Sequence, residues 1–245
     1  MKIYIMKILS LFSNLWIFRS IFSSIYFNFR LLPFNQAIKL PILLYKPKFG
    51  KLRHGSVIID CKVEPGMIRI GHNVVNLYPN NGCMIDIKGS IVFKGRCLMG
   101  NNTRISVGEH GTLVFGEWFE STTEMKIACY NSIIFGNHVL VGWDCLFLDT
   151  DFHSLSSLDG KKNKGFAPII VGDEVWFGAG CRIYKKSIIP SRCVISSNTN
   201  VYSDLSRFSY SVIGNKRELI PLSPGMFRNY QDDKIDYSIG KNNSV

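Results

Sequence analysis

One histidine of the 245-residue chain lies in a setting that suits proton transfer. His153 follows Asp149 and Asp151, and the polar stretch 154–165 comes directly after it. A neutral imidazole can accept a hydroxyl proton near neutral pH. On an extended backbone Asp151, two residues earlier, would share a face with His153. We therefore expect His153 to act as a general base that Asp151 orients; turn capping is the alternative role for both aspartates.

The other histidines are scattered along the chain, at His54, His72, His110 and His138. No two of the five histidines lie within 14 residues of each other, whereas a catalytic zinc needs three ligands brought together. His72 and His138 stand beside Gly and Asn, which is typical of turns. We expect no metal site.

The cysteines also have a spacing that argues against metal binding. There are seven, an odd number, and no Cys-x-x-Cys pair occurs, unlike in a zinc ribbon or a secreted disulfide scaffold. Cys145 and Cys181 fall at inward positions of a repeat, where a thiol fills space as a small apolar group. We expect both to be structural rather than nucleophilic, in a reducing compartment.

From residue 171 onward the sequence repeats every six residues. The leading position is always apolar: Val171, Phe177, Ile183, Ile189, Ile195 and Val201. The position four residues later is small or apolar: Val175, Cys181, Ser187, Cys193, Thr199 and Leu205. A helix would show apolar spacings of three and four, and a simple strand a spacing of two. A period of six is neither.

A period of six predicts a short strand followed by a turn. Three such units form a coil with three flat sides, and stacked coils bury their leading residues in one core. The same register appears earlier, at Phe93 and Phe135. We therefore expect an all-β fold, a parallel β-helix over 55–206, followed by a tail over 207–245. The loop 154–168 interrupts the coils, and such loops commonly carry function.

The positive charge of the chain is concentrated at its amino terminus. The formal net charge is +11, from 29 Lys and Arg against 18 Asp and Glu. Residues 1–59 hold nine basic residues and no acidic one, so the remainder is nearly neutral. A nucleic-acid-binding protein would usually carry a basic stripe on its folded domain. Here the basic segment is also the most apolar and aromatic, which is typical of a membrane-surface segment.

Residues 1–54 are predicted to form a helical segment outside the repeat. Apolar side chains recur at spacings of three or four on one helix face: Leu11, Leu15, Phe18, Phe22, Ile25 and Phe29. The uncharged runs on either side of Arg19 are too short to span a membrane. Three hypotheses stay open: a helix packed on its own domain or a partner subunit, a helix in the membrane interface, and a cleaved signal peptide.

The repeat and two segments within it resemble a known family. VGWDCLFLDTDFHSL at 141–155 and PIIVGDEVWFGAGCRI at 168–183 are similar to hexapeptide-repeat acyltransferases, especially those of bacterial capsule and O-antigen polysaccharide biosynthesis. The resemblance is close over about 130–205 and weaker over 55–130. It implies a left-handed β-helix, usually trimeric, that uses acetyl-CoA. Many members have Gly-Asn-Pro-Ala near the end, whereas here Lys216 and Arg217 follow Gly214-Asn215.

The resemblance also bears on individual residues. The histidine of the family's Asp-x-Asp-x-His segment is the base, and His153 matches it. Asp149 and Trp143 are the expected acceptor-binding residues; a subunit contact is the alternative for Trp143. Five residues after the loop are expected at acetyl-CoA: Trp176, Gly178 and Ala179 along the pantetheine arm, and Lys185 and Lys186 near phosphate. A solvated pair is the alternative for the two lysines.

Together these features predict an O-acetyltransferase that moves acetyl from acetyl-CoA directly to a sugar hydroxyl of a surface polysaccharide or its lipid-linked precursor. One alternative keeps the fold and changes the acceptor to an amino sugar, a serine or a xenobiotic. Another is a non-catalytic β-helix scaffold. We expect a cytoplasmic homotrimer, peripheral at the inner membrane face. Kinase and dehydrogenase chemistry lacks support, because the sequence has no Gly-rich phosphate loop.

Overall fold

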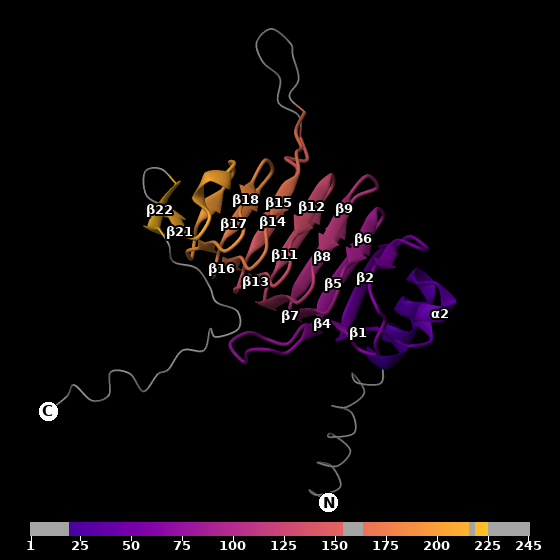
Figure 1. Cartoon of the computed structure of the whole chain (residues 1–245). Helices are drawn as coiled ribbons and strands as arrows, with labels where there is room; N and C mark the ends of the chain where they lie inside the picture. The colour runs from indigo at the N-terminus through magenta and orange to yellow at the C-terminus, as the bar shows by residue number, and fades with distance from the viewer. Residues whose placement is uncertain (1–19, 154–163, 216–218, 225–245) are drawn as a thin grey trace, which may run out of the picture.

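The structure, a computed structural model, describes residues 20–153, 164–215 and 219–224. Strands form three sheets, which Figure 1 shows side by side along one solenoid. Sheet A contains β1 (Ile42–Leu44), β4 (Ile68–His72), β7 (Cys97–Asn101), β10 (Phe119–Thr123), β13 (Leu140–Val141), β16 (Trp176–Phe177), β19 (Val194–Ile195), β21 (Ser211–Asn215) and β22 (Leu219–Pro224). Sheet B contains β2 (Pro47–Leu52), β5 (Cys83–Ile87), β8 (Thr103–Val107), β11 (Lys126–Cys129), β14 (Leu146–Leu148), β17 (Arg182–Tyr184) and β20 (Asn200–Val201). Sheet C contains β3 (Val57–Ile59), β6 (Ser90–Phe93), β9 (Thr112–Phe115), β12 (Ser132–Phe135), β15 (Ile169–Val171) and β18 (Ile188–Ile189).

The chain passes from sheet A to sheet B to sheet C and then starts the next coil on sheet A. Neighbouring strands within each sheet run parallel, apart from the closing antiparallel pair β21–β22. In the last coil a 3₁₀ turn over Ser206–Phe208 follows β20. This is the predicted fold, a left-handed parallel β-helix, and the prediction is confirmed.

The repeat has the physical meaning expected of it. Every leading residue and every fourth-following residue from 171 to 205 is at most 2% exposed. The strand register stacks the leading residues in columns, with Phe177 beside Ile195 and Ile183 beside Val201. Because each coil has only three short sides, two inward positions per side fill the prism. This explains why a period of six replaces the usual strand period of two.

Aromatic rings form the middle of the core. The rings of Phe93, Phe115 and Phe135 stack with centroids 5.4 and 5.5 Å apart, one from each of three successive coils. Phe147 and Phe177 continue the contact in edge-to-face geometry, at 4.9 and 5.1 Å. All five rings are at most 2% exposed, and each buried side chain of this size stabilises the fold by about 1.5–3 kcal/mol.

The coils begin earlier than the predicted boundary at residue 55. β1 and β2 already pair with β4 and β5, so the first coil starts at Ile42. Residues 20–31 are helical, as expected, and the short helix α2 (Phe34–Ala37) follows. Together these helices cover the amino-terminal end of the solenoid (Figure 1).

Buried polar side chains attach the helix over 20–31 to the free edge of β1. The Nδ2 atom of Asn28 donates to the carbonyls of Ser24 and Ile42, both at 2.7 Å. The Oγ atom of Ser24 accepts from the backbone N–H of Leu44 at 2.9 Å. These bonds satisfy backbone groups that an open sheet edge would otherwise leave unpaired.

The predicted apolar stripe of this helix faces outward. Phe22 is 69% exposed and Phe29 is 43% exposed, whereas Ser20, Ser24 and Asn28 are buried. Leu11, Leu15 and Phe18 lie outside the described residues. The helix does pack on its own domain, but through another side, on which Phe27 and Leu31 are buried together with these polar residues. Within the described ranges, no helix has the length and apolar character that crossing a membrane requires.

Candidate active site

His153 lies where the chain turns from sheet B to sheet C. In most coils this corner takes a few residues, as at 185–187 between β17 and β18. Between β14 and β15 it takes residues 149–168, and Figure 1 shows the chain leaving the solenoid there. This is the predicted loop, of which 154–163 lie outside the described residues.

A short antiparallel stem holds the two ends of this loop together. Thr150 pairs with Phe166 as an isolated bridge. The N–H of Asp151 donates to the carbonyl of Gly165 at 2.8 Å, and the N–H of Ala167 donates to the carbonyl of Asp149 at 3.1 Å. The stem therefore holds the backbone as far as Asp151, two residues before His153.

Asp149 anchors the stem from inside the solenoid. Its side chain is fully buried, and its carboxylate accepts the N–H groups of Tyr130 at 2.7 Å and Asn131 at 2.8 Å. Burial raises the pKa of Asp149, although these hydrogen bonds oppose that shift. The expected contact between Asp149 and an acceptor is not supported, because both oxygens point into the corner of the preceding coil. Capping, the alternative role, fits this geometry.

We expect Asp149→Asn to loosen the stem. An amide offers one acceptor oxygen, so its NH₂ group would face one of the two N–H donors, at a cost of about 1–3 kcal/mol. Urea denaturation measures the loss. Asp151→Asn is the matched control, because it removes only a half-exposed ion pair worth less than about 1 kcal/mol. Equal midpoints for the two variants would contradict the anchoring role.

His153 is exposed, although it follows the inward Phe147 by six residues. The six-residue spacing stops at Asp149, where the chain leaves the coil. Phe152 has a left-handed backbone, with φ of 58°, and its N–H donates to the Oγ1 atom of Thr150 at 3.1 Å. Its ring packs edge-to-face on Tyr130 with centroids 4.8 Å apart. These contacts of Phe152 set the direction in which the chain presents His153.

Asp151 and Lys185 form an ion pair across successive coils. The carboxylate expected to orient His153 is therefore engaged by a lysine that was expected at a cofactor phosphate. Lys185 is mostly buried along its side chain, with 22% exposed, whereas its neighbour Lys186 is exposed. Lys186 has φ of 70° and donates its N–H to the carbonyl of Pro168 at the end of the loop.

The remaining predicted residues lie at or near the opposite edge of sheet B, at the corner between sheets A and B. The N–H of Gly180 donates to the carbonyl of Trp143 at 2.7 Å, so these two turns stack. Trp143 and Trp176 are 37% and 40% exposed. Gly178 is buried, and a Cβ atom there would lie 2.7 Å from the backbone nitrogen of Ser197. Close stacking of coils is thus a sufficient reason for this glycine.

Ala179, beside Gly178, is half-buried at the same corner. Between Ala179 and Lys185 the chain runs along β17, an extended span of up to about 20 Å. One chain therefore brings His153, Asp151, Lys185 and Lys186 together at one corner. The same chain places Trp143 and Ala179 at the other corner, between sheets A and B.

An ion-paired aspartate, which the sequence did not indicate, stabilises the second corner. Asp144 pairs with Lys126 at 2.7 Å and with Arg182 at 3.0 Å, and thereby links three successive coils. Partial burial alone would raise the pKa of Asp144, but the hydrogen bonds from Lys126 and Arg182 hold it below its usual value.

We expect Asp144→Asn to destabilise the fold in a pH-dependent way. A lowered pKa means that ionised Asp144 stabilises the folded state above its unfolded pKa of about 3.9, and that this contribution is lost as the pH falls. The carboxylate is 41% exposed, so the loss at pH 7 should stay below about 1 kcal/mol. Urea midpoints of both proteins at pH 7 and pH 3 should differ at pH 7 and converge at pH 3. A difference of the same size at both pH values would contradict this account.

Several solved structures are similar to this chain. The chain is similar to hexapeptide-repeat acetyltransferases. One similar structure is the polysialic-acid-specific acetyltransferase NeuO, at 13% identity over 75% of this chain and 87% of that one, with a TM-score of 0.45. Another is the polysialic acid O-acetyltransferase OatWY, at 18% identity over 81% and 93%, with a TM-score of 0.42. A third is VCA0836 of Vibrio cholerae, solved with acetyl-CoA, at 16% identity over 82% of both chains, with a TM-score of 0.35.

A curated relative matches part of the sequence. It is an uncharacterized 24.8 kDa protein in the cps region of Klebsiella pneumoniae, 26% identical over 138 residues. The match covers 56% of this chain, and the chain spans 60% of that relative's length. No protein-family model matches the sequence. Among the described residues, no three His, Cys, Asp or Glu side chains come together as a metal would require.

Proposed function

We propose that the protein is an O-acetyltransferase that moves acetyl from acetyl-CoA to a sugar hydroxyl of a bacterial surface polysaccharide, such as a capsule or O-antigen, or of its lipid-linked precursor. The observation that carries the proposal is the exposed imidazole of His153 on a stem built into a left-handed β-helix. The position of the Klebsiella relative in a capsule (cps) region supports the choice of acceptor.

In this proposal His153 is the general base. It removes the proton from the acceptor hydroxyl as the oxygen attacks the thioester carbonyl, and it returns the proton to sulfur as CoA leaves. No protein nucleophile is required. Cys145 and Cys181 are fully buried between the coils, so neither sulfur is accessible to a bound substrate.

We propose that the active protein is a homotrimer whose sites lie between subunits. The arrangement of sheet B supports this proposal, because β14 separates Trp143 from His153 and leaves them at opposite edges of the sheet within one chain. A neighbouring subunit that places its Trp143 corner against the His153 corner would complete the site. Trp176, Ala179 and Lys186 then line the acetyl-CoA side. Lys185 contacts a CoA phosphate only if its ion pair with Asp151 is broken first.

We further propose a cytoplasmic location, peripheral to the inner membrane face, where an acceptor linked to lipid would be met. The exposed apolar side of the helix over 20–31 supports this placement.

The test of the function combines three measurements on the full chain. Calorimetry is expected to detect acetyl-CoA binding, light scattering to give the mass of three chains, and thiol release to depend on added polysaccharide. Absence of acetyl-CoA binding would favour a scaffold instead. Thiol release with serine or an amino sugar, but not with polysaccharide, would contradict the proposed polysaccharide acceptor and identify a different one.

A further inference from the structure

The outward side of the amino-terminal helices forms an apolar surface, here called the cap face. It consists of Ile21, Phe22, Ile25, Tyr26 and Phe29 from the helix over 20–31, with Phe34 and Ile38 from α2 and the turn after it. These side chains are between 36% and 70% exposed. The rings of Phe29 and Phe34 touch, with centroids 5.9 Å apart, so the surface continues from one helix to the next. Soluble monomers rarely expose a contiguous patch of this kind without a partner.

The helix differs from an ordinary amphipathic helix of a soluble protein because its exposed side is apolar as well. Its buried side combines the core residues Phe27 and Leu31 with Ser20, Ser24 and Asn28, whose side chains bond to β1 and the turn after it. Its outward side presents only large apolar and aromatic residues between Ser20 and Phe29, apart from the half-buried Ser23 at the margin. Hydrogen bonds and the burial of Phe27 and Leu31 together fix this orientation, so the apolar exposure is a property of the fold.

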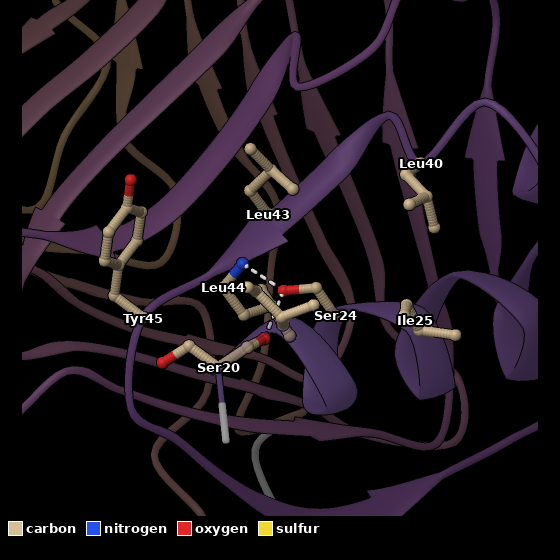
Figure 2. A pocket seen from close by; sticks show the side chains of 8 residues that line it. Ser20, Ser24, Ile25, Leu40, Leu43, Leu44 and Tyr45 are labelled. Atoms are coloured by element: carbon tan, nitrogen blue, oxygen red, sulfur yellow. Dashed lines mark hydrogen bonds between the residues drawn. The ribbon is translucent and has the colours of Figure 1, made fainter. Parts of the chain in front are cut away.

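Two cavities flank the helix. On one side lies an apolar cavity of about 340 Å³, lined by Ile21, Ile25, Leu40, Leu43 and neighbouring side chains. Figure 2 shows Leu40 and Leu43 across from Ser24 and Ile25, and the hydrogen bond from the N–H of Leu44 to Ser24 between two residues that line the cavity. Its size and lining suit a segment of hydrocarbon chain.

On the other side lies a cavity of about 660 Å³, lined by Phe22, Ser23, Lys46, Pro47, Lys48, Asn80 and Asn81. Lys46 donates to the carbonyl of Asn80 at 3.1 Å, and Lys48 is exposed. Lysine and amide N–H groups at the edge of an apolar surface suit phosphate groups.

The charged residues on the cap face segments themselves are all basic, and Glu64, from the next coil near Leu40, is paired with Arg96. Lys39 and Lys48 are exposed beside it, Arg30 lies at the end of the helix, and the sequence has no acidic residue before Asp60. The chain outside the described residues joins at Ser20, next to this face, and adds Lys2, Lys7 and Arg19 without any acid. An apolar surface surrounded by cations fits an anionic bilayer, which offers hydrocarbon below a layer of phosphate.

We infer that the cap face is a docking surface for an anionic lipid bilayer. The helix over 20–31 lies flat in the interface with Phe22 and Phe29 among the acyl chains. Lys39, Lys46 and Lys48 meet lipid phosphates, and the apolar cavity accepts the end of one acyl chain. The inference names the surface and the lipid class behind the proposed membrane location, and it does not depend on acetyl transfer.

Vesicle co-sedimentation of the full chain tests the inference. Vesicles of phosphatidylcholine alone are compared with vesicles that contain roughly one third phosphatidylglycerol, a content at which each nearby lysine strengthens binding measurably. Wild type is expected to bind the anionic vesicles, and added salt to weaken binding. Phe22→Ser/Phe29→Ser and Lys39→Glu/Lys48→Glu should each reduce binding by at least roughly tenfold. Tyr202→Ser, which removes a 65% exposed ring at the other end of the solenoid, should leave it unchanged.

Circular dichroism and acetyl-CoA binding of every variant distinguish this surface from the catalytic proposal. Because the replaced side chains are exposed, both are expected to match wild type. Vesicle binding that survives both double substitutions, or equal binding to the two vesicle types, would overturn the inference. A fall in oligomeric mass caused by Phe22→Ser/Phe29→Ser would also overturn it, because the cap face would then join copies of the chain.

Discussion

Replacement of His153 by alanine is expected to lower acetyl transfer by roughly 10²–10⁴-fold, the usual contribution of a general base. The imidazole is exposed on a stem held by backbone hydrogen bonds, so its loss should leave the fold intact. Affinity for acetyl-CoA should also be unchanged, because the proposed role begins with the acceptor proton. Thiol release in the presence of polysaccharide measures the rate, and calorimetry measures the affinity.

His54→Ala is the matched control for this experiment. His54 is also an exposed histidine at a corner between sheets B and C, but it belongs to the first coil, four coils before His153. The His54→Ala variant should transfer acetyl at the wild-type rate. If His153→Ala retains wild-type transfer, His153 is not the base. If both variants lose activity alike, the effect is not specific to the loop.

The largest effect on stability is expected from Phe135→Ala. Phe135 is 1% exposed and lies within 5.5 Å, between ring centroids, of Phe115, Phe119 and Phe147. Removing the ring leaves a cavity among three aromatic neighbours, one from the same coil and one from each adjacent coil, which the stacked strands hold in place. We expect a loss of about 3–5 kcal/mol in the free energy of unfolding, measured by urea denaturation.

Ile134→Ala provides the comparison within the same strand. Ile134 is 38% exposed, because it points away from the prism. Its truncation should cost less than about 1 kcal/mol, since little apolar surface is lost from the interior. Similar losses for the two variants would contradict the inward register of the repeat.

The solenoid could be predicted from sequence because its core is periodic. Each leading residue from Val171 to Val201 reports directly on an inward position, and no distant contact has to be known. The amino-terminal end is different. The spacing of Phe22, Ile25 and Phe29 correctly indicated a helix with an apolar side. The direction of that side depends on the bonds of Ser24 and Asn28 to β1, which periodicity does not contain.

The candidate site was predictable only in part for the same reason. The loop and its aspartates stood out because they break the repeat, but the burial of Asp149 depends on N–H groups 18 and 19 residues earlier. In a coil of about 18 residues, residues 18 apart in the sequence lie above one another. A search for polar or charged partners at that spacing could therefore have found this contact and the pair of Lys126 with Asp144. The contact of Phe152 with Tyr130 had no comparable signal, because it forms outside the repeat.

The measurement that tests the central claim most directly is the acetyl content of the polysaccharide, determined by NMR, in cells that carry the wild-type gene, the His153→Ala gene or a deletion. The account predicts one acetyl ester that is present with wild type and absent from the other two. An unchanged polysaccharide in the deletion strain would contradict the proposed function. Full acetylation with His153→Ala would contradict the proposed base.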